Sequence, residues 1–291
     1  MKYDPDFYGC QFTLPGGITI NGSTDSNGCD WILTKESGWF AAPAIKTARV
    51  DKPAARGVFR GNEFRGARVM TLEGTLGAPN VPTLRNAVRT LLGICPDPHV
   101  QYPLTVTEES GLSSYANVVL DGEILTTPIS ATSVAFSVQL AAPDPRKFST
   151  APNTYSVPLA SAGTGGVSYP VGYPVNYGLP GNPGSVSLAN HGTAEADPVF
   201  VFAGPLTTPY VVRADTGDTI TYQGTLTSTD SLSIDSGSGA VLLNGGVNRR
   251  ALVSASSWFS VPGNASITVL FRTANPADTG TLSVTVADTS F

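Results

Sequence analysis

The stretch "LSIDSGSGAVLLNGG", residues 232–246, decides the fold class of the second half of the chain. Leu232 and Ile234 alternate with polar residues, a Ser-Gly-Ser-Gly turn follows, and the apolar run 240–243 returns. Alternation interrupted by such a turn is typical of a β-hairpin. Asp235 then lies at a strand end, where a short carboxylate accepts hydrogen bonds from turn amides. The segment therefore predicts a hairpin rather than a metal or substrate site.

Similar short segments continue through residues 185–291. Consecutive segments are separated by Gly, Asn, Asp or Pro, which is the pattern of a β-sandwich or jelly roll. We therefore expect residues 185–291 to form an all-β domain. Its expected strands are 185–189, 198–203, 210–213, 219–222, 231–234, 240–243, 266–271 and 281–286.

Residues 1–147 predict a separate β domain with a single packed helix, of α+β type. Apolar and polar residues alternate in several stretches, as in half-buried strands. The helix is expected in "PNVPTLRNAVRTLLGI", residues 79–94, where Asn80 can cap the first turn and Gly93 can end the last. The expected strands include 18–20, 67–73, 104–107, 116–120 and 134–140, and the expected apolar stripe of the helix is Leu84, Val88, Leu91 and Leu92.

Residues 148–184 have no helical or strand period and predict an extended connector. Pro and Gly recur throughout, and both disfavour regular structure. Tyrosines recur as well, whereas disordered linkers are poor in aromatic residues. The connector is therefore expected to lie along a surface, with a neighbouring subunit as one candidate. Its tyrosines are Tyr155, Tyr169, Tyr173 and Tyr177.

Charge and composition exclude several classes of protein. Only 13% of residues are charged, and no apolar run is long enough to cross a bilayer, so we expect no membrane insertion. Residues 1–150 carry 13 Lys/Arg against 14 Asp/Glu, and residues 151–291 carry 4 against 8. Nucleic-acid recognition is not expected without a basic excess. Three cysteines without CxxC spacing predict buried, reduced thiols in a chain that folds in a cytosol.

The sequence gives no catalytic, cofactor-binding or metal-binding residues, and we expect no enzyme and no cofactor. His99 and His191 are the two histidines, and there is no GxSxG, HExxH or GxxxxGK[ST] motif. The spacing of His191, Glu195 and Asp197 matches no strong metal-ligand pattern. Trp258 and Phe259 could suggest a sugar platform, but adjacent strand residues point to opposite faces, so core packing of at least one is favoured.

The most charged stretch is "TARVDKPAARGVFRGNEFRGARVM", residues 47–70, preceded by Lys46. One interpretation is a long solvated hairpin loop. The other is a loop that inserts along a neighbouring subunit and pairs with its acidic surface, since Arg suits interfacial ion pairs. On the second interpretation the candidate subunit-interface residues are Lys46, Arg49, Lys52, Arg56, Arg60, Arg65 and Arg68.

The order of several segments resembles the distal tail protein of siphovirus-type bacteriophages, in the version common among phages of actinobacteria. The first domain resembles it in "RVMTLEGTLGAPNVPTLRNAVRTLLGI" and "LAAPDPRKFS", and the connector in "GGVSYPVGYPVNYG". The second domain resembles it in "ANHGTAEADPVFVFAGPLTTPYVVRADTGDTI", "DSLSIDSGSGAVLLNGGVNRR" and "SSWFSVPGNASITVLF". The resemblance covers nearly the whole chain.

The resemblance implies a virion structural protein at the tail tip, assembled in the cytoplasm of the host bacterium. It implies that the first domain forms a homohexameric ring and that the second is a galectin-like sandwich. The implied partners are further copies of the chain, the tail tube protein and the baseplate hub proteins, with a host-surface glycan as a candidate ligand. An alternative function is a carbohydrate-binding module or adhesin that attaches to cell-wall glycans through residues 185–291.

Overall fold

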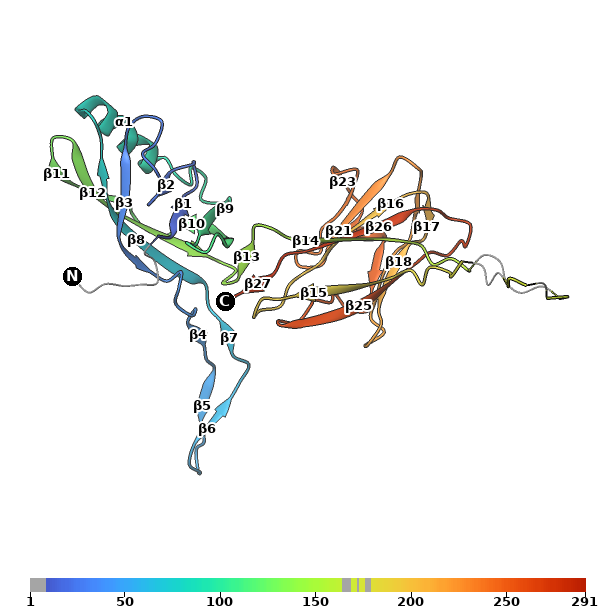
Figure 1. The fold of residues 1–291 in the computed structure, drawn as a ribbon. Coiled ribbons are helices and arrows are strands. Elements are labelled where there is room, and N and C mark those ends of the chain that lie inside the picture. Colours follow the sequence, from blue (N-terminus) through green and yellow to red (C-terminus); the bar gives the residue numbers. More distant parts are fainter. Residues whose placement is uncertain (1–8, 164–168, 172, 176–178) are drawn as a thin grey trace. The chain divides into compact units, whose positions relative to one another are not determined.

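The computed structural model describes residues 9–163, 169–171, 173–175 and 179–291 (Figure 1). The chain divides into two compact units: unit 1 is Met1–Thr150 with Phe291, and unit 2 is Ala151–Ser290. Both are built mainly from β-strands, and α1 (Val81–Leu92) is the one α-helix of the described part. The prediction of a mainly β protein with a single packed helix is confirmed.

Unit 1 is built on a large sheet whose neighbouring strands are antiparallel and mostly not consecutive in sequence. The strand order is β2-β1-β9-β10-β12-β8-β3, with β11 on β12 and β13 on β10. In β8 the buried residues alternate with half-exposed ones, as a strand with one face on a core requires. The strands are β1 (Gln11–Thr13), β2 (Thr19–Ile20), β3 (Asp30–Ser37), β8 (Arg68–Gly77), β9 (Tyr102–Thr107), β10 (Ser113–Leu120), β11 (Leu125–Ser130), β12 (Ser133–Ala142) and β13 (Lys147–Ser149).

Helix α1 begins and ends where the sequence predicts. The Asn80 side chain accepts a hydrogen bond from the Thr83 amide at 2.9 Å, and Gly93 follows the last turn. Leu91 is fully buried, and Leu84 and Val88 pack against the core. Leu92 is 52% exposed, so its inclusion in the apolar stripe was wrong: it lies one residue past the buried face of the helix.

Unit 2 consists of two main sheets around one core. The six-stranded sheet has the order β14-β26-β16-β21-β22-β23, and the five-stranded sheet has the order β15-β25-β18-β19-β24. Phe202 of the first and Phe271 of the second are fully buried, with ring centroids 5.8 Å apart. The expected sandwich is thus present.

The eight strands expected in residues 185–291 all form. The strands of the six-stranded sheet are β14 (Asn153–Pro158), β26 (Thr281–Val286), β16 (Val199–Ala203), β21 (Ser231–Asp235), β22 (Val241–Leu243) and β23 (Val247–Asn248). Those of the five-stranded sheet are β15 (Ser185–Asn190), β25 (Ala265–Arg272), β18 (Tyr210–Arg213), β19 (Thr219–Tyr222) and β24 (Val253–Ala255). β17 (Leu206–Thr207) and β20 (Thr225–Leu226) form a separate two-stranded sheet, β27 (Thr289–Ser290) is a further short strand, and η1 (Arg250–Leu252) is a 3₁₀ turn.

The start of the expected connector differs from the prediction. Within residues 148–184, β14 pairs along its whole length with β26, and Val157 is buried in the core of unit 2. The strand was missed because Pro152 precedes it and Pro158 is its last residue, and proline disfavours strand interiors. The expected extended course at 164–168, 172 and 176–178, which include Tyr177, lies outside the described residues.

Residues 232–246 contain the expected hairpin of β21 and β22. Leu232 lies opposite Leu243 across β21 and β22. The Asp235 carboxylate accepts hydrogen bonds from the Gly237 amide at 2.9 Å and the Ser238 hydroxyl at 2.6 Å. These contacts confirm that Asp235 holds the turn.

The three cysteines are buried, as expected, and burial raises the pKa of each thiol. Within the described ranges, no helix has the length and apolar character to cross a membrane.

Candidate functional site

A long β-hairpin leaves the sheet of unit 1 between β3 and β8. We call residues 44–66 the arm (Figure 1). Its proximal ladder joins β4 (Ile45–Lys46) to β7 (Phe64–Arg65), and its distal ladder joins β5 (Arg49–Asp51) to β6 (Val58–Arg60). Almost every residue of these four strands is exposed. The arm is therefore a two-stranded ribbon without a core of its own.

Six of the seven candidate interface residues lie on the arm. Arg60 pairs with Glu63, and Arg49 lies 3.7 Å from the same carboxylate. The hydrogen bonds from Arg60 lower the pKa of the Glu63 carboxyl. With Asp51 as its other acidic residue, the arm has a net charge of +4. The six residues are Lys46, Arg49, Lys52, Arg56, Arg60 and Arg65.

The arm also exposes apolar side chains that the sequence interpretation missed. Val50 and Phe59 lie opposite each other in the distal ladder, and the Lys52 ammonium lies 5.4 Å from the centre of the Phe59 ring. The signal was visible as valine, isoleucine and phenylalanine interleaved with arginine. A ribbon this exposed and apolar is typical of a segment that binds another chain. The apolar residues are Ile45, Val50, Val58, Phe59 and Phe64, each 38–68% exposed.

Arg68, the seventh candidate, is not a surface residue. It is 1% exposed, and its guanidinium donates hydrogen bonds to backbone carbonyls of Gly38, Trp39, Ala41 and Pro145. Burial lowers the pKa of this guanidinium. Its assignment as an interface contact was wrong, because its partners come from distant parts of the sequence that the local charge pattern cannot show.

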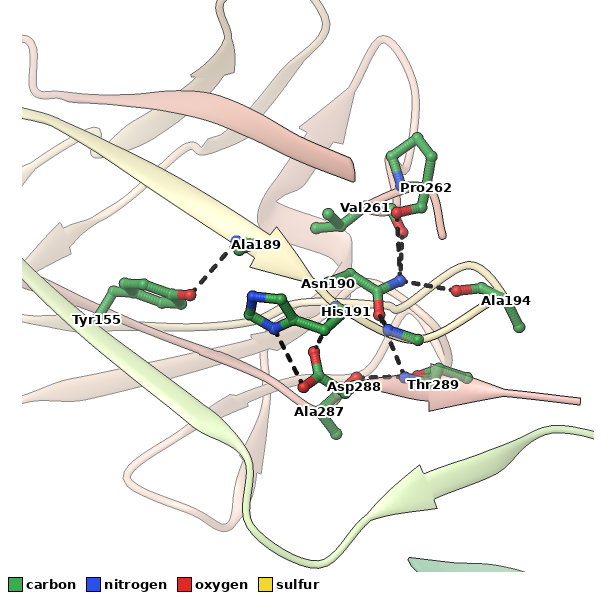
Figure 2. Close-up of polar contacts among 11 residues, drawn as sticks. Tyr155, Ala189, Asn190, His191, Ala194, Val261, Pro262, Ala287, Asp288 and Thr289 are labelled. Carbon is green, nitrogen blue, oxygen red and sulfur yellow. Dashed lines mark hydrogen bonds and ion pairs between the residues drawn. The ribbon is translucent and has the colours of Figure 1, made fainter. Parts of the chain in front are cut away.

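His191 lies beside a buried polar network rather than in a metal site (Figure 2). Its Nδ1 is 3.3 Å from the Asp288 carboxylate, and its amide donates to the same carboxylate at 2.8 Å. The neighbouring Asn190 is 1% exposed. Its side-chain amide donates a hydrogen bond to the Ala194 carbonyl and accepts one from the Gly192 amide. Across the part of the chain that the structure describes, no group of three His, Cys, Asp or Glu side chains could hold a metal ion.

Trp258 and Phe259 do not form a free aromatic platform. Phe259 is buried against Phe200, with ring centroids 5.7 Å apart. The Arg250 guanidinium lies 4.5 Å from the centre of the Trp258 ring and covers one of its faces. The expectation that at least one of the two aromatic residues packs in the core is confirmed.

Comparison with known proteins gives a match within unit 2. Residues 191–285 match the family of the siphovirus-type tail component, C-terminal domain, typified by SPP1 Dit. The match covers most of the sandwich, including the hairpin at residues 232–246. A search of curated proteins finds no match to the sequence.

Solved structures share the fold of the chain as a whole. The crystal structure of SPP1 Dit (gp 19.1), described as a paradigm of the hub adsorption apparatus in phages that infect Gram-positive bacteria, aligns with a TM-score of 0.60 at 12% identity, over 87% of this chain and 92% of that one. A chain of the phage P2 baseplate in its activated conformation with Ca aligns at 0.51 and 10% identity, over 94% and 97%. At these identities the two alignments show a shared fold.

Proposed function

We propose that the chain is the distal tail protein of a siphovirus-type bacteriophage, a ring at the tail tip that joins the tail tube to the baseplate. The observation that carries the proposal is the tail-component match at residues 191–285, on a chain whose fold aligns with SPP1 Dit over most of both lengths. The protein would be a virion component, assembled in the host cytoplasm, with the tail tube protein and baseplate hub proteins as neighbours.

The arm supplies the contact between copies in this proposal. A closed ring is made of identical heterologous interfaces, in which one surface of a copy meets a different surface of the next. The arm is basic and partly apolar, whereas residues 151–291 carry a net charge of −4. Opposite charges of this kind favour association and set its register. The number six, the galectin-like character of unit 2 and an actinobacterial host are supported by the sequence resemblance.

The test is the oligomeric state of the full chain. Native mass spectrometry and negative-stain images should show a closed ring of six copies that dissociates as salt is raised. Reversing two arm charges (Arg49→Glu with Arg56→Glu) should abolish the ring. The matched control reverses two exposed arginines of α1 (Arg85→Glu with Arg89→Glu) and should leave it intact. A wild-type chain that stays monomeric at high concentration, and does not enter tails, would refute the proposal.

Attachment to cell-wall glycans through unit 2 is the competing function, and it makes a different prediction. The purified protein should then bind glycans on an array saturably, and the Trp258→Ala variant should lose this binding. Because Arg250 already covers one face of the Trp258 ring, we expect no such binding.

A further inference from the structure

The arm is joined to the sheet by a stretch in which the two strands are unequal. Pairing of β3 with β8 ends at Ser37 and Thr71, and pairing in the arm starts at Ile45 and Arg65. Residues 38–44 therefore face residues 66–70, and we call these two segments the root. The root includes the first and last residues of the arm, Ala44 and Gly66. An unequal stretch cannot continue a regular ladder, so its backbone carbonyls need other donors.

The side chain of Arg68 supplies those donors. Its Nη1 donates to the carbonyls of Gly38 at 2.6 Å, Trp39 at 2.9 Å and Ala41 at 2.6 Å. Its Nε donates to the carbonyl of Pro145 at 3.0 Å, beyond the end of β12. One buried guanidinium thus ties the first segment of the root to the second and to the chain after β12. Hydrogen bonds from a charged donor are stronger than neutral ones.

Further contacts fix the same segment. The Trp39 amide donates to the Glu36 carboxylate at 2.5 Å, and the Lys147 ammonium lies 3.5 Å from the Trp39 carbonyl and 5.5 Å from its ring centre. Gly38 has a φ of 106°, and a Cβ there would lie 2.1 Å from the Val69 carbonyl. The root is therefore closely packed and tied on both strands.

Outside the root, the proximal arm has one contact of this kind, since the Arg65 guanidinium lies 4.0 Å from the centre of the Phe291 ring. The ladders of the arm are two and three residues long, and their side chains face solvent. Two-stranded ribbons are at best marginally stable by themselves in water. The direction in which the arm leaves unit 1 is then set chiefly at the root, where the buried contacts lie.

We propose that Arg68 is a positioning residue that fixes the direction of the arm and thereby the angle at which one copy reaches the next. The effect of Arg68 on assembly rests on the proposed function, because a heterologous interface closes into a ring only if the rotation between neighbouring copies is correct. The role is distinct from that of an interface contact, since Arg68 is buried within its own copy.

The direction of the arm is measured without reference to assembly. Spin labels at Arg56→Cys on the tip of the arm and Asn86→Cys on α1, in protein diluted with unlabelled chain, give a distance distribution by electron paramagnetic resonance. Arg68→Lys keeps the charge but loses the planar fork of donors, so the distribution should broaden at least twofold. The matched control, Arg49→Lys in the exposed distal ladder, whose ion pair with Glu63 lies within the arm, should leave it unchanged. An unchanged distribution in folded Arg68→Lys overturns the inference, whether or not rings form.

Hydrogen exchange of the unaltered protein gives a second measurement that needs no variant. The Gly66 amide, bonded to the Ala44 carbonyl at the root, should exchange at least tenfold more slowly than the Gly61 amide, bonded to Ala48 in the distal arm. Equal rates at the two amides would overturn a fixed root.

The consequence for assembly is tested last, on protein that circular dichroism shows to be folded. Arg68→Lys should yield open or irregular oligomers where the wild type gives closed rings. Normal rings together with a broadened distance distribution would show that the direction of the arm does not control ring closure and would overturn that part of the inference. Absence of rings in the wild type is a failure of the proposed function, and it leaves the two measurements of the root to decide on Arg68 by themselves.

Discussion

Replacing Asn190 by aspartate tests the buried network of unit 2 with almost no change in shape (Figure 2). The Asn190 Nδ2 donates to the carbonyls of Ala194 at 2.7 Å, Val261 at 3.1 Å and Pro262 at 3.3 Å. Its Oδ1 accepts from the Gly192 amide at 3.0 Å and the Thr289 amide at 3.3 Å. Aspartate keeps the acceptor side and replaces the donor with an oxygen that faces three carbonyls.

The expected loss of stability follows from these contacts. An amide has two N–H groups, and losing both removes about 2 kcal/mol of net hydrogen bonding. Carbonyls left buried without a donor cost about 1–3 kcal/mol more. We therefore expect Asn190→Asp to lower the free energy of unfolding of unit 2 by about 3–5 kcal/mol. For a unit of this size that is a fall in melting temperature of about 10–15 °C.

The pH dependence of the loss gives the sharper test. Burial and the facing carbonyls should raise the pKa of the introduced carboxyl in the folded state above its unfolded value of about 3.9. The folded variant then binds more protons than the unfolded chain between these two values, so its stability falls as pH rises through that window. The difference from wild type should be smallest near pH 4 and should grow towards neutral pH.

The measurement is urea unfolding of the full chain at several pH values, compared with the matched variant Asn248→Asp. Asn248 is exposed, and its side-chain oxygen accepts from the Arg250 amide at 2.9 Å, which aspartate preserves. This control should change stability by less than about 0.5 kcal/mol. A loss for Asn190→Asp below about 1 kcal/mol, or one that is flat with pH, would refute the assignment of Asn190 as the donor to these carbonyls.

Three further changes test other parts of the fold by thermal or urea unfolding. Gly38→Ala should destabilise unit 1 by more than about 4 kcal/mol, because the added Cβ would lie 2.1 Å from the Val69 carbonyl. Gly57→Ala, where the added Cβ meets open space, should cost about 1 kcal/mol of backbone strain from its positive φ. Equal losses for the two variants would contradict the packing of the root. Leu91→Ala should lower the free energy of unfolding by about 2–4 kcal/mol, and Leu92→Ala by less than about 1 kcal/mol. A larger loss for Leu92→Ala than for Leu91→Ala would show that Leu92 does belong to the apolar stripe of the helix. Hydrogen bonds from Thr227 and Asn244 lower the pKa of Asp230 to about 2, so the stabilisation by its carboxylate is complete above about pH 4 and is lost as pH falls towards 2. The melting temperature of Asp230→Asn should therefore fall less than that of the wild type between about pH 4 and about pH 2. Parallel falls in melting temperature would count against those hydrogen bonds.

Local features of the fold could be predicted because their causes are local. The Asn80 cap and the turn at Asp235 each depend on atoms within a few residues, and alternation along β21 fixes which side chains face the core. The burial of Arg68 could not be predicted in this way. Its acceptors lie about 30 residues before it and 77 residues after it, and only the closed fold brings them together. A charge pattern reports what a residue could pair with, not whether solvent reaches it.

The same distinction explains what was missed on the arm. The arginines were read as the partner-binding groups, but exposed ion pairs contribute little by themselves and are screened by salt. Phe59 and Phe64 offer apolar surface, whose burial contributes about 25 cal/mol per Å². The cations then have a second effect, since charge along the open edges of a ribbon opposes indiscriminate strand pairing. In the proposed ring, burial of the aromatic residues would add to the salt-sensitive attraction between the arm and an acidic surface, while the charges would restrict binding to that surface.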